Sequence, residues 1–177
     1  MVDPLTLRRW TYRAGFLAVS ACVIFIHILP FHISADALPA PDLLVLLAFA
    51  WVLRKPAYVP VLLVAGVILV SDILFMRPLG LWTALVLLGL EFLRVRRNVS
   101  AELPFLVEWM MVTAVLFALT ILNGLVLALF AVPRPPLTAI LVHVFITAAC
   151  YPAVVAFSAF VMGVRSAGPA EREGSRA

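Results

Sequence analysis

The sequence predicts an all-α, polytopic membrane protein, and two observations carry that prediction. Of the 177 residues, 65% are hydrophobic and only 12% are charged, and the mean hydropathy is +1.15. A soluble globule of this size needs far more polar surface than such a composition supplies. The basic residues also gather in small clusters between apolar runs, the pattern of topology determinants, so we predict no nucleic-acid partner despite the formal net charge of +4.

Six apolar runs, taken in order, are the predicted membrane-spanning helices: residues 14–33, 38–53, 59–75, 79–93, 104–132 and 137–162. Residues 2–13 precede them as an amphipathic segment in which arginines stand beside Trp10 and Tyr12, as at a lipid headgroup boundary. Residues 94–103 form a predicted polar loop. We expect one six-helix domain over residues 1–163 and a disordered cytoplasmic tail over residues 164–177.

The second run is short for a membrane helix. Its 16 residues, 38–53, extend about 24 Å as a helix, whereas the hydrocarbon core of a bilayer is about 30 Å thick. We therefore predict that this helix either thins the bilayer or leans on neighbouring helices.

Charge asymmetry predicts the orientation. Of the 13 Lys and Arg residues, all except Arg77 and Arg134 fall in alternate connections or at the termini. By the positive-inside rule, both termini are expected in the cytoplasm. The residues placed on the cytoplasmic side are Arg8, Arg9, Arg13, Arg54, Lys55, Arg94, Arg96, Arg97, Arg165, Arg172 and Arg176.

Two acids and one base near the predicted external face are the first candidate site. Asp42 begins the second helix, Asp72 lies one turn before the end of the third, and Arg77 follows in the next turn. These residues would line a polar cavity or a docking surface. Alternatively, Asp42 caps its helix and Asp72 pairs with Arg77 or another polar group, because an acid within a span normally has an internal partner.

The remaining polar residues favour structure over chemistry. His27 and His143 lack a second ligand at helical spacing, so no metal site is predicted. Cys22 and Cys150 fall in apolar runs, which favours buried thiols over a disulfide. Glu91 and Glu108 are expected in ion pairs at the cytoplasmic boundary. No nucleophile, zinc or phosphate-loop motif appears, so we predict neither catalytic residues nor a cofactor.

Between residues 38 and 97 the chain resembles the rod shape-determining protein MreD family in its alphaproteobacterial form. The resemblance rests on an ordered series: Pro41-Asp42-Leu43-Leu44, Trp51, Arg54-Lys55-Pro56, Gly66 with Ser71-Asp72-Ile73-Leu74, and Arg77-Pro78-Leu79-Gly80. The residues that the resemblance suggests for partner binding or structure are Pro41, Asp42, Arg54, Pro56, Asp72, Arg77, Pro78 and Gly80.

The resemblance implies a non-enzymatic subunit of the cell-elongation machinery in the bacterial inner membrane. Proteins of that family associate with MreC, and through it with the RodA glycosyltransferase, its partner transpeptidase and MreB. The layout is also similar to the six-helix substrate-binding subunits of energy-coupling-factor vitamin transporters, which gives an alternative function in small-molecule uptake. Because the external connections after residues 75 and 132 are short and offer little to close a lid, the sequence favours the scaffold.

Overall fold

A computed structural model describes residues 4–29, 39–100, 104–133 and 136–160. Over these residues the chain consists of helices and contains no strand. The elements are α1 (Pro4–Ile28), α2 (Leu43–Arg54), the 3-10 turn η1 (Pro56–Tyr58), α3 (Val61–Leu74), α4 (Leu81–Ser100), α5 (Phe105–Leu129) and α6 (Leu137–Phe160). Three of the helices, α1, α5 and α6, are long and apolar enough to cross a membrane.

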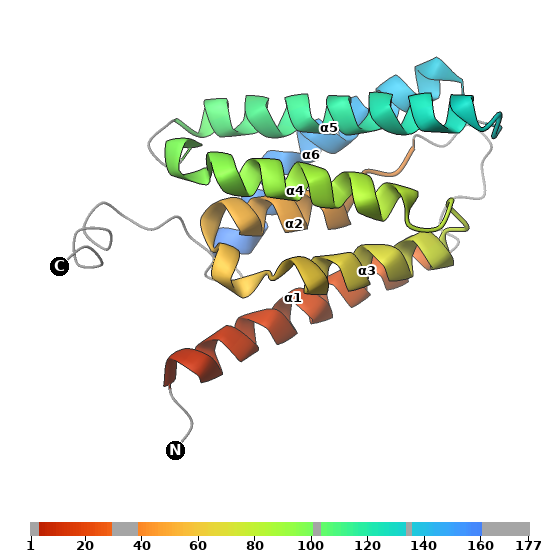
Figure 1. The fold of residues 1–177 in the computed structure, drawn as a ribbon. Coiled ribbons are helices and arrows are strands. Elements are labelled where there is room, and N and C mark those ends of the chain that lie inside the picture. Colours follow the sequence, from red (N-terminus) through yellow and green to blue (C-terminus); the bar gives the residue numbers. More distant parts are fainter. Residues whose placement is uncertain (1–3, 30–38, 101–103, 134–135, 161–177) are drawn as a thin grey trace.

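Successive helices reverse direction, so α1 begins and α6 ends at the same end of the bundle (Figure 1). This end, called the basic end below, also holds η1 and the second half of α4 with Arg94 and Arg96. The opposite end holds the α3–α4 turn with Arg77, the end of α5 and the start of α6. We call it the acidic end because Asp42 and Asp72 both lie there.

Helix α2 is the core of the fold, although it has only 12 residues. It packs against α1, α3, α4 and α6, and every residue from Leu44 to Arg54 is buried. A helix of this length extends about 18 Å, well below the thickness of a hydrocarbon core. Because the neighbouring helices enclose it, α2 meets protein on all sides, which explains why it is apolar around its whole circumference.

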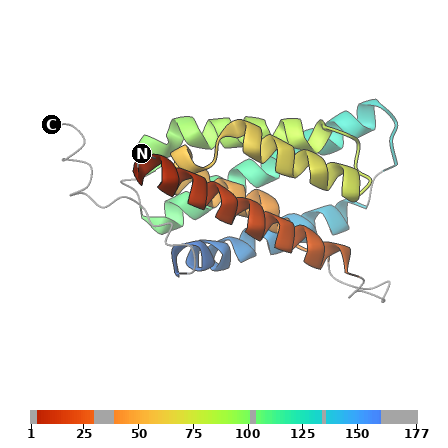
Figure 2. The ribbon, with the colours of Figure 1, turned by 90° about the horizontal axis from the view of Figure 1, so that it is seen from below.

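The outer helices present apolar side chains outward, as a bundle in lipid would. Helix α1 lies on the outside (Figure 2) and buries little beyond Phe16 and Ser20. An aromatic cluster holds it in place: Tyr12 stacks on Tyr58 with ring centroids 4.3 Å apart, and Phe16 meets the edge of Trp51 at 5.4 Å. Helix α5 packs mainly against α4 and α6 and exposes Ile121 and Leu125.

Several predicted boundaries differ from the structure. Helix α1 begins at Pro4, so the amphipathic segment is the first part of the same helix. Helix α4 continues to Ser100, although a loop was predicted from residue 94. There Arg94 bonds Glu91 one turn earlier at 3.0 Å and the carbonyl of Val59 at 3.0 Å, so charged side chains extend the helix. The predicted end of the first span, residues 30–33, and the tail after residue 163 lie outside the described residues.

Candidate functional site

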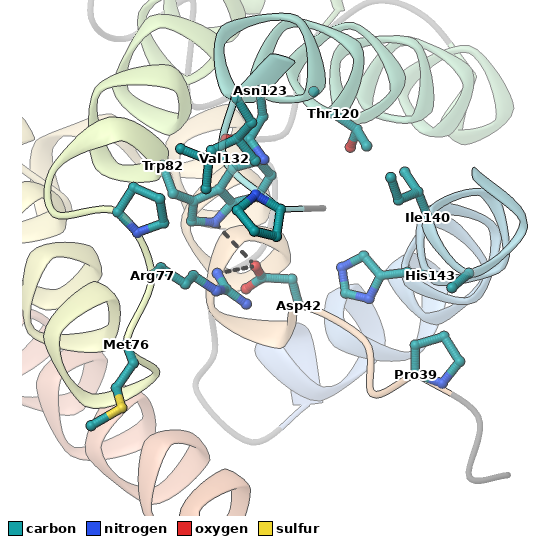
Figure 3. A pocket seen from close by; sticks show the side chains of 15 residues that line it. Pro39, Asp42, Met76, Arg77, Trp82, Thr120, Asn123, Val132, Ile140 and His143 are labelled. Carbon is teal, nitrogen blue, oxygen red and sulfur yellow. Dashed lines mark hydrogen bonds and ion pairs between the residues drawn. The ribbon is translucent and has the colours of Figure 1, made fainter. Parts of the chain in front are cut away.

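A cavity of about 440 Å³ opens at the acidic end. It lies among the segment before α2, the α3–α4 turn, the end of α5 and the start of α6 (Figure 3). Trp82 and Arg77 stand on one side, Ile140 and His143 face them from α6, and Asn123 and Thr120 close the third side. Each of the four walls therefore contributes a polar group, including Asp42 from the segment before α2 and His143 from α6, to a cavity whose remaining lining is mostly apolar.

Asp42 is the polar centre of this cavity. Its Oδ2 accepts a hydrogen bond from the indole Nε1 of Trp82 at 3.1 Å and from Nη1 of Arg77 at 3.3 Å. The backbone N–H of Asp42 donates to the hydroxyl of Thr147 on α6 at 3.2 Å. Asp42 occupies the position before α2, but its side chain makes no capping bond. The prediction that the Asp42 side chain caps α2 is therefore wrong. Its carboxylate links the start of α2 to Trp82 on α4 instead.

Local chain geometry positions Arg77. Its N–H donates to the carbonyl of Asp72 at 3.0 Å and the N–H of Met76 donates to that of Ile73 at 3.3 Å, the two bonds of a Schellman helix end. The motif needs a left-handed residue, here Met76 with φ of +51°. Gly80 then has φ of +79°, which L side chains rarely adopt, and α4 begins at the next residue.

Asp72 lies inside the bundle and pairs with a different residue from the one first expected. It is fully buried. Its Oδ2 accepts hydrogen bonds from the hydroxyl of Thr83 at 2.7 Å and from the N–H of Thr83 at 3.1 Å. Arg77 is engaged with Asp42, so the predicted pair between Asp72 and Arg77 is wrong, whereas the expectation of an inward side chain with another polar partner is confirmed. A carboxylate without exposed surface cannot itself touch a partner.

The basic end carries a second polar cluster, distant from the cavity. Nη1 of Arg54, which is 6% exposed, lies 2.9 Å from Oε1 of Glu108, and the hydroxyl of Tyr151 donates to the same oxygen. Nearby, the indole of Trp51 donates to the hydroxyl of Ser158 at 3.1 Å. These contacts tie the end of α2 to α5 and α6, and they confirm the ion pairs predicted for Glu108 and, with Arg94, for Glu91.

The other predicted residues fall into two groups. Pro78 lines the cavity, and the carbonyl of Pro41 accepts the first N–H of α2 at 3.0 Å. Pro56 opens η1 at the basic end, so it is not part of the cavity.

The two cysteines are not bonded to each other. Cys150 is half-buried and Cys22 is exposed, so the burial predicted for Cys22 is wrong. Among the described residues, no three His, Cys, Asp or Glu side chains gather as a metal site requires.

Trp82 and Thr83, which bind the two acids, were not among the residues predicted from the sequence. Both follow Gly80 within the first turn of α4. The available signal was therefore two side chains with hydrogen-bond donors directly after a glycine turn. Asn123 and Thr120 were equally informative, because a polar residue near the end of an otherwise apolar helix is costly in lipid. They lie on α5, far along the chain, and only folding brings them to Asp42.

Together these elements define the class of protein. Over the described residues it is all-helical, with three helices able to cross a membrane by length and composition, and it has a polar cavity at one end of the bundle. No known protein family, curated protein or solved structure matches the chain.

Proposed function

We propose that the chain is a non-enzymatic, six-span subunit of the cell-elongation complex in the bacterial inner membrane, with both termini in the cytoplasm. In this role it docks MreC and helps to localise peptidoglycan synthesis by the RodA glycosyltransferase and its partner transpeptidase. Through MreC it also associates indirectly with MreB. The proposal derives from the resemblance of residues 38–97 to the MreD family. The cavity at the acidic end would then belong to the docking surface.

One observation carries the proposal. Asp42 and Arg77 belong to two separate elements of the resemblance, 35 residues apart, and they form an ion pair in one wall of the cavity. Pro78 lines the same cavity, and the turn that contains Met76 and Gly80 positions Arg77 and Trp82. A shared sequence pattern that converges on one partly exposed surface favours a common task for that surface. Arg77, with its side chain 33% exposed, is the member best placed to meet a partner.

Recovery of MreC with a tagged copy of the chain tests the proposal. We expect MreC and the elongation synthases to co-purify from membranes, and Arg77→Ala to weaken that recovery while membrane levels of the chain stay normal. Lys55→Ala, which removes a cation at the basic end, is the matched control. Asp72→Asn should act through folding, because the residue is buried. A tagged chain that is abundant in membranes but brings down no MreC would refute the proposal.

The cavity itself favours the alternative, a binding subunit for small-molecule (vitamin) uptake. Its volume of about 440 Å³ falls within the range typical of ligand sites, about 300–1,000 Å³. Deletion of the gene separates the two functions. Rounded, swollen cells with normal uptake support the scaffold, whereas normal rods with an auxotrophy relieved by high external vitamin support the transporter subunit.

A further inference from the structure

We propose that the cavity at the acidic end binds one phosphoethanolamine group, a zwitterion with a phosphate and a primary ammonium, from a membrane lipid or free in solution. The phosphate would lie at the guanidinium of Arg77 and the ammonium between Asp42 and the ring of Trp82. This inference rests on the cavity alone and is independent of the proposed role in cell elongation.

The charges in the cavity are the first argument. Arg77 and Asp42 contribute one charge of each sign, so the ionised side chains of the lining cancel. A net anion bound to Arg77 would leave the carboxylate of Asp42 without a counter-charge, and a net cation bound to Asp42 would leave the guanidinium without one. A zwitterion presents both signs at once and satisfies both groups. The pairing of opposite charges therefore favours a ligand that carries both.

The geometry of the pair leaves capacity for such a ligand. Nη1 of Arg77 lies 3.3 Å from Oδ2 of Asp42, longer than the roughly 2.7–2.9 Å of a tight charge-assisted bond. The guanidinium carries five N–H donors, and this contact uses one nitrogen. Arg77 also lies 5.8 Å from the centre of the Trp82 ring, so the indole face is already in contact with a cation. A ligand ammonium beside Asp42 would make this cation–π contact in place of the guanidinium, which would bind the phosphate.

The border of the cavity suits the apolar part of an amphiphile. Met76, which lines the cavity, is 95% exposed, and Leu129 and Leu137 at the adjoining helix ends are 81% and 72% exposed. Polar groups inside the cavity and exposed apolar side chains at the same end of the bundle match a headgroup joined to acyl chains. A position at the end of the bundle also places the cavity where headgroups lie if the helices span a bilayer.

Two glycines supply a test that does not disturb the charges. Gly124 lines the cavity, and a Cβ built there would meet no atom within 4 Å. The Cβ of a larger side chain is therefore accommodated at this position, and Gly124→Leu would place the rest of its side chain in the cavity. Gly66, in the middle of α3, has the same open surroundings but does not line the cavity. Gly66→Leu is accordingly the matched control for the added side chain.

The experiment measures lipid retention by native mass spectrometry. The full chain is placed in nanodiscs of equal amounts of phosphatidylethanolamine and phosphatidylglycerol, then extracted gently. We expect a first adduct of one phosphatidylethanolamine, enriched about tenfold over phosphatidylglycerol, equivalent to about 1.4 kcal/mol. Gly124→Leu and Arg77→Ala should abolish the enrichment, and Gly66→Leu should preserve it. O-phosphoethanolamine is titrated against the delipidated chain in parallel, and tighter binding of this free form would assign the site to a soluble source.

Several results would overturn the proposal. Equal retention of the two lipids would remove the zwitterion preference, and an equal loss in both glycine variants would show that the retained lipid lies outside the cavity. Absence of binding by both the lipid and the free headgroup would refute the site. Circular dichroism of each variant establishes folding, and Gly124→Leu keeps the test decisive if Arg77→Ala does not fold.

Discussion

At the scale of single residues, Asp42 and Asp72 show two ways in which a carboxylate is stabilised in an apolar bundle. Asp42 lies at the cavity and receives a cation and an indole N–H. Asp72 is fully enclosed, and its Oδ2 receives only the hydroxyl and N–H of Thr83. A buried polar group that loses its partner costs about 1–3 kcal/mol, and more when it is charged. Thr83 is therefore as important to the fold as the acid that it binds.

Thr83→Val tests this dependence because it keeps the side-chain shape and removes the hydroxyl donor. We expect a loss of about 1–3 kcal/mol in the free energy of unfolding, measured by circular dichroism in mixed micelles. Thr120→Val is the control, since the hydroxyl of Thr120 bonds only the carbonyl of Leu116 one turn earlier. Equal effects of the two substitutions would show that the Asp72–Thr83 contact has no special weight.

At the scale of elements, close approach of helices explains how α2 is enclosed. Helix α4 packs against both α2 and α5, and Gly89 lies where the three meet. A Cβ at Gly89 would come within 2.9 Å of Cδ1 of Leu119, 3.1 Å of Cγ1 of Val115 and 3.2 Å of the ring of Phe49. A glycine suits this position because any added Cβ would require the ends of these buried side chains to shift.

Gly89→Ala is expected to destabilise the bundle by about 1–3 kcal/mol through overpacking, even though alanine has the higher helix propensity. Gly66→Ala provides the contrast: with no atom within 4 Å of the new methyl, it should stabilise by about 0.5–1 kcal/mol. Thermal unfolding of the two purified variants measures both effects. If both stabilise, the helices have room that the structure does not show.

At the scale of the whole molecule, the alternating helices separate the charges into two ends. Arg54, Arg94 and Arg96 lie at the basic end, and Arg77 lies at the acidic end. An even number of helices that alternate in direction returns the chain to the end where it began (Figure 1). With the positive-inside rule, this arrangement favours a cytoplasmic basic end and an external cavity.

Cysteine labelling with a membrane-impermeant reagent tests this orientation in a variant in which Cys22 and Cys150 are replaced by serine. Single cysteines at positions 36, 77 and 134 should react in intact cells, and those at positions 55 and 97 only after the membrane is broken. The opposite pattern would invert the molecule, and labelling of positions 55 and 77 from the same side would contradict six crossings.

The sequence alone determined the helical class, the approximate position of each helix and the separation of basic residues. These properties follow from composition, apolar run length and charge order, all of which are local along the chain. The inward orientation of Asp72 was also predictable, because the cost of an exposed charge in lipid does not depend on which partner satisfies it. The continuation of α4 past Arg94 was not, since it is also supported by the bond from Arg94 to the carbonyl of Val59, 35 residues earlier in the chain.

Only the tertiary structure decided which groups meet. Arg77 lies five residues after Asp72, yet the chain turn directs its side chain to Asp42. The carboxylate of Asp72 accepts its hydrogen bonds from Thr83 instead. The enclosure of α2, the close approach at Gly89 and the cavity depend on α5 and α6, which are distant along the chain. Pairing in a packed bundle is set by helix register and crossing, which depend on every contact at once. A local sequence pattern therefore does not predict the register or crossing of the helices.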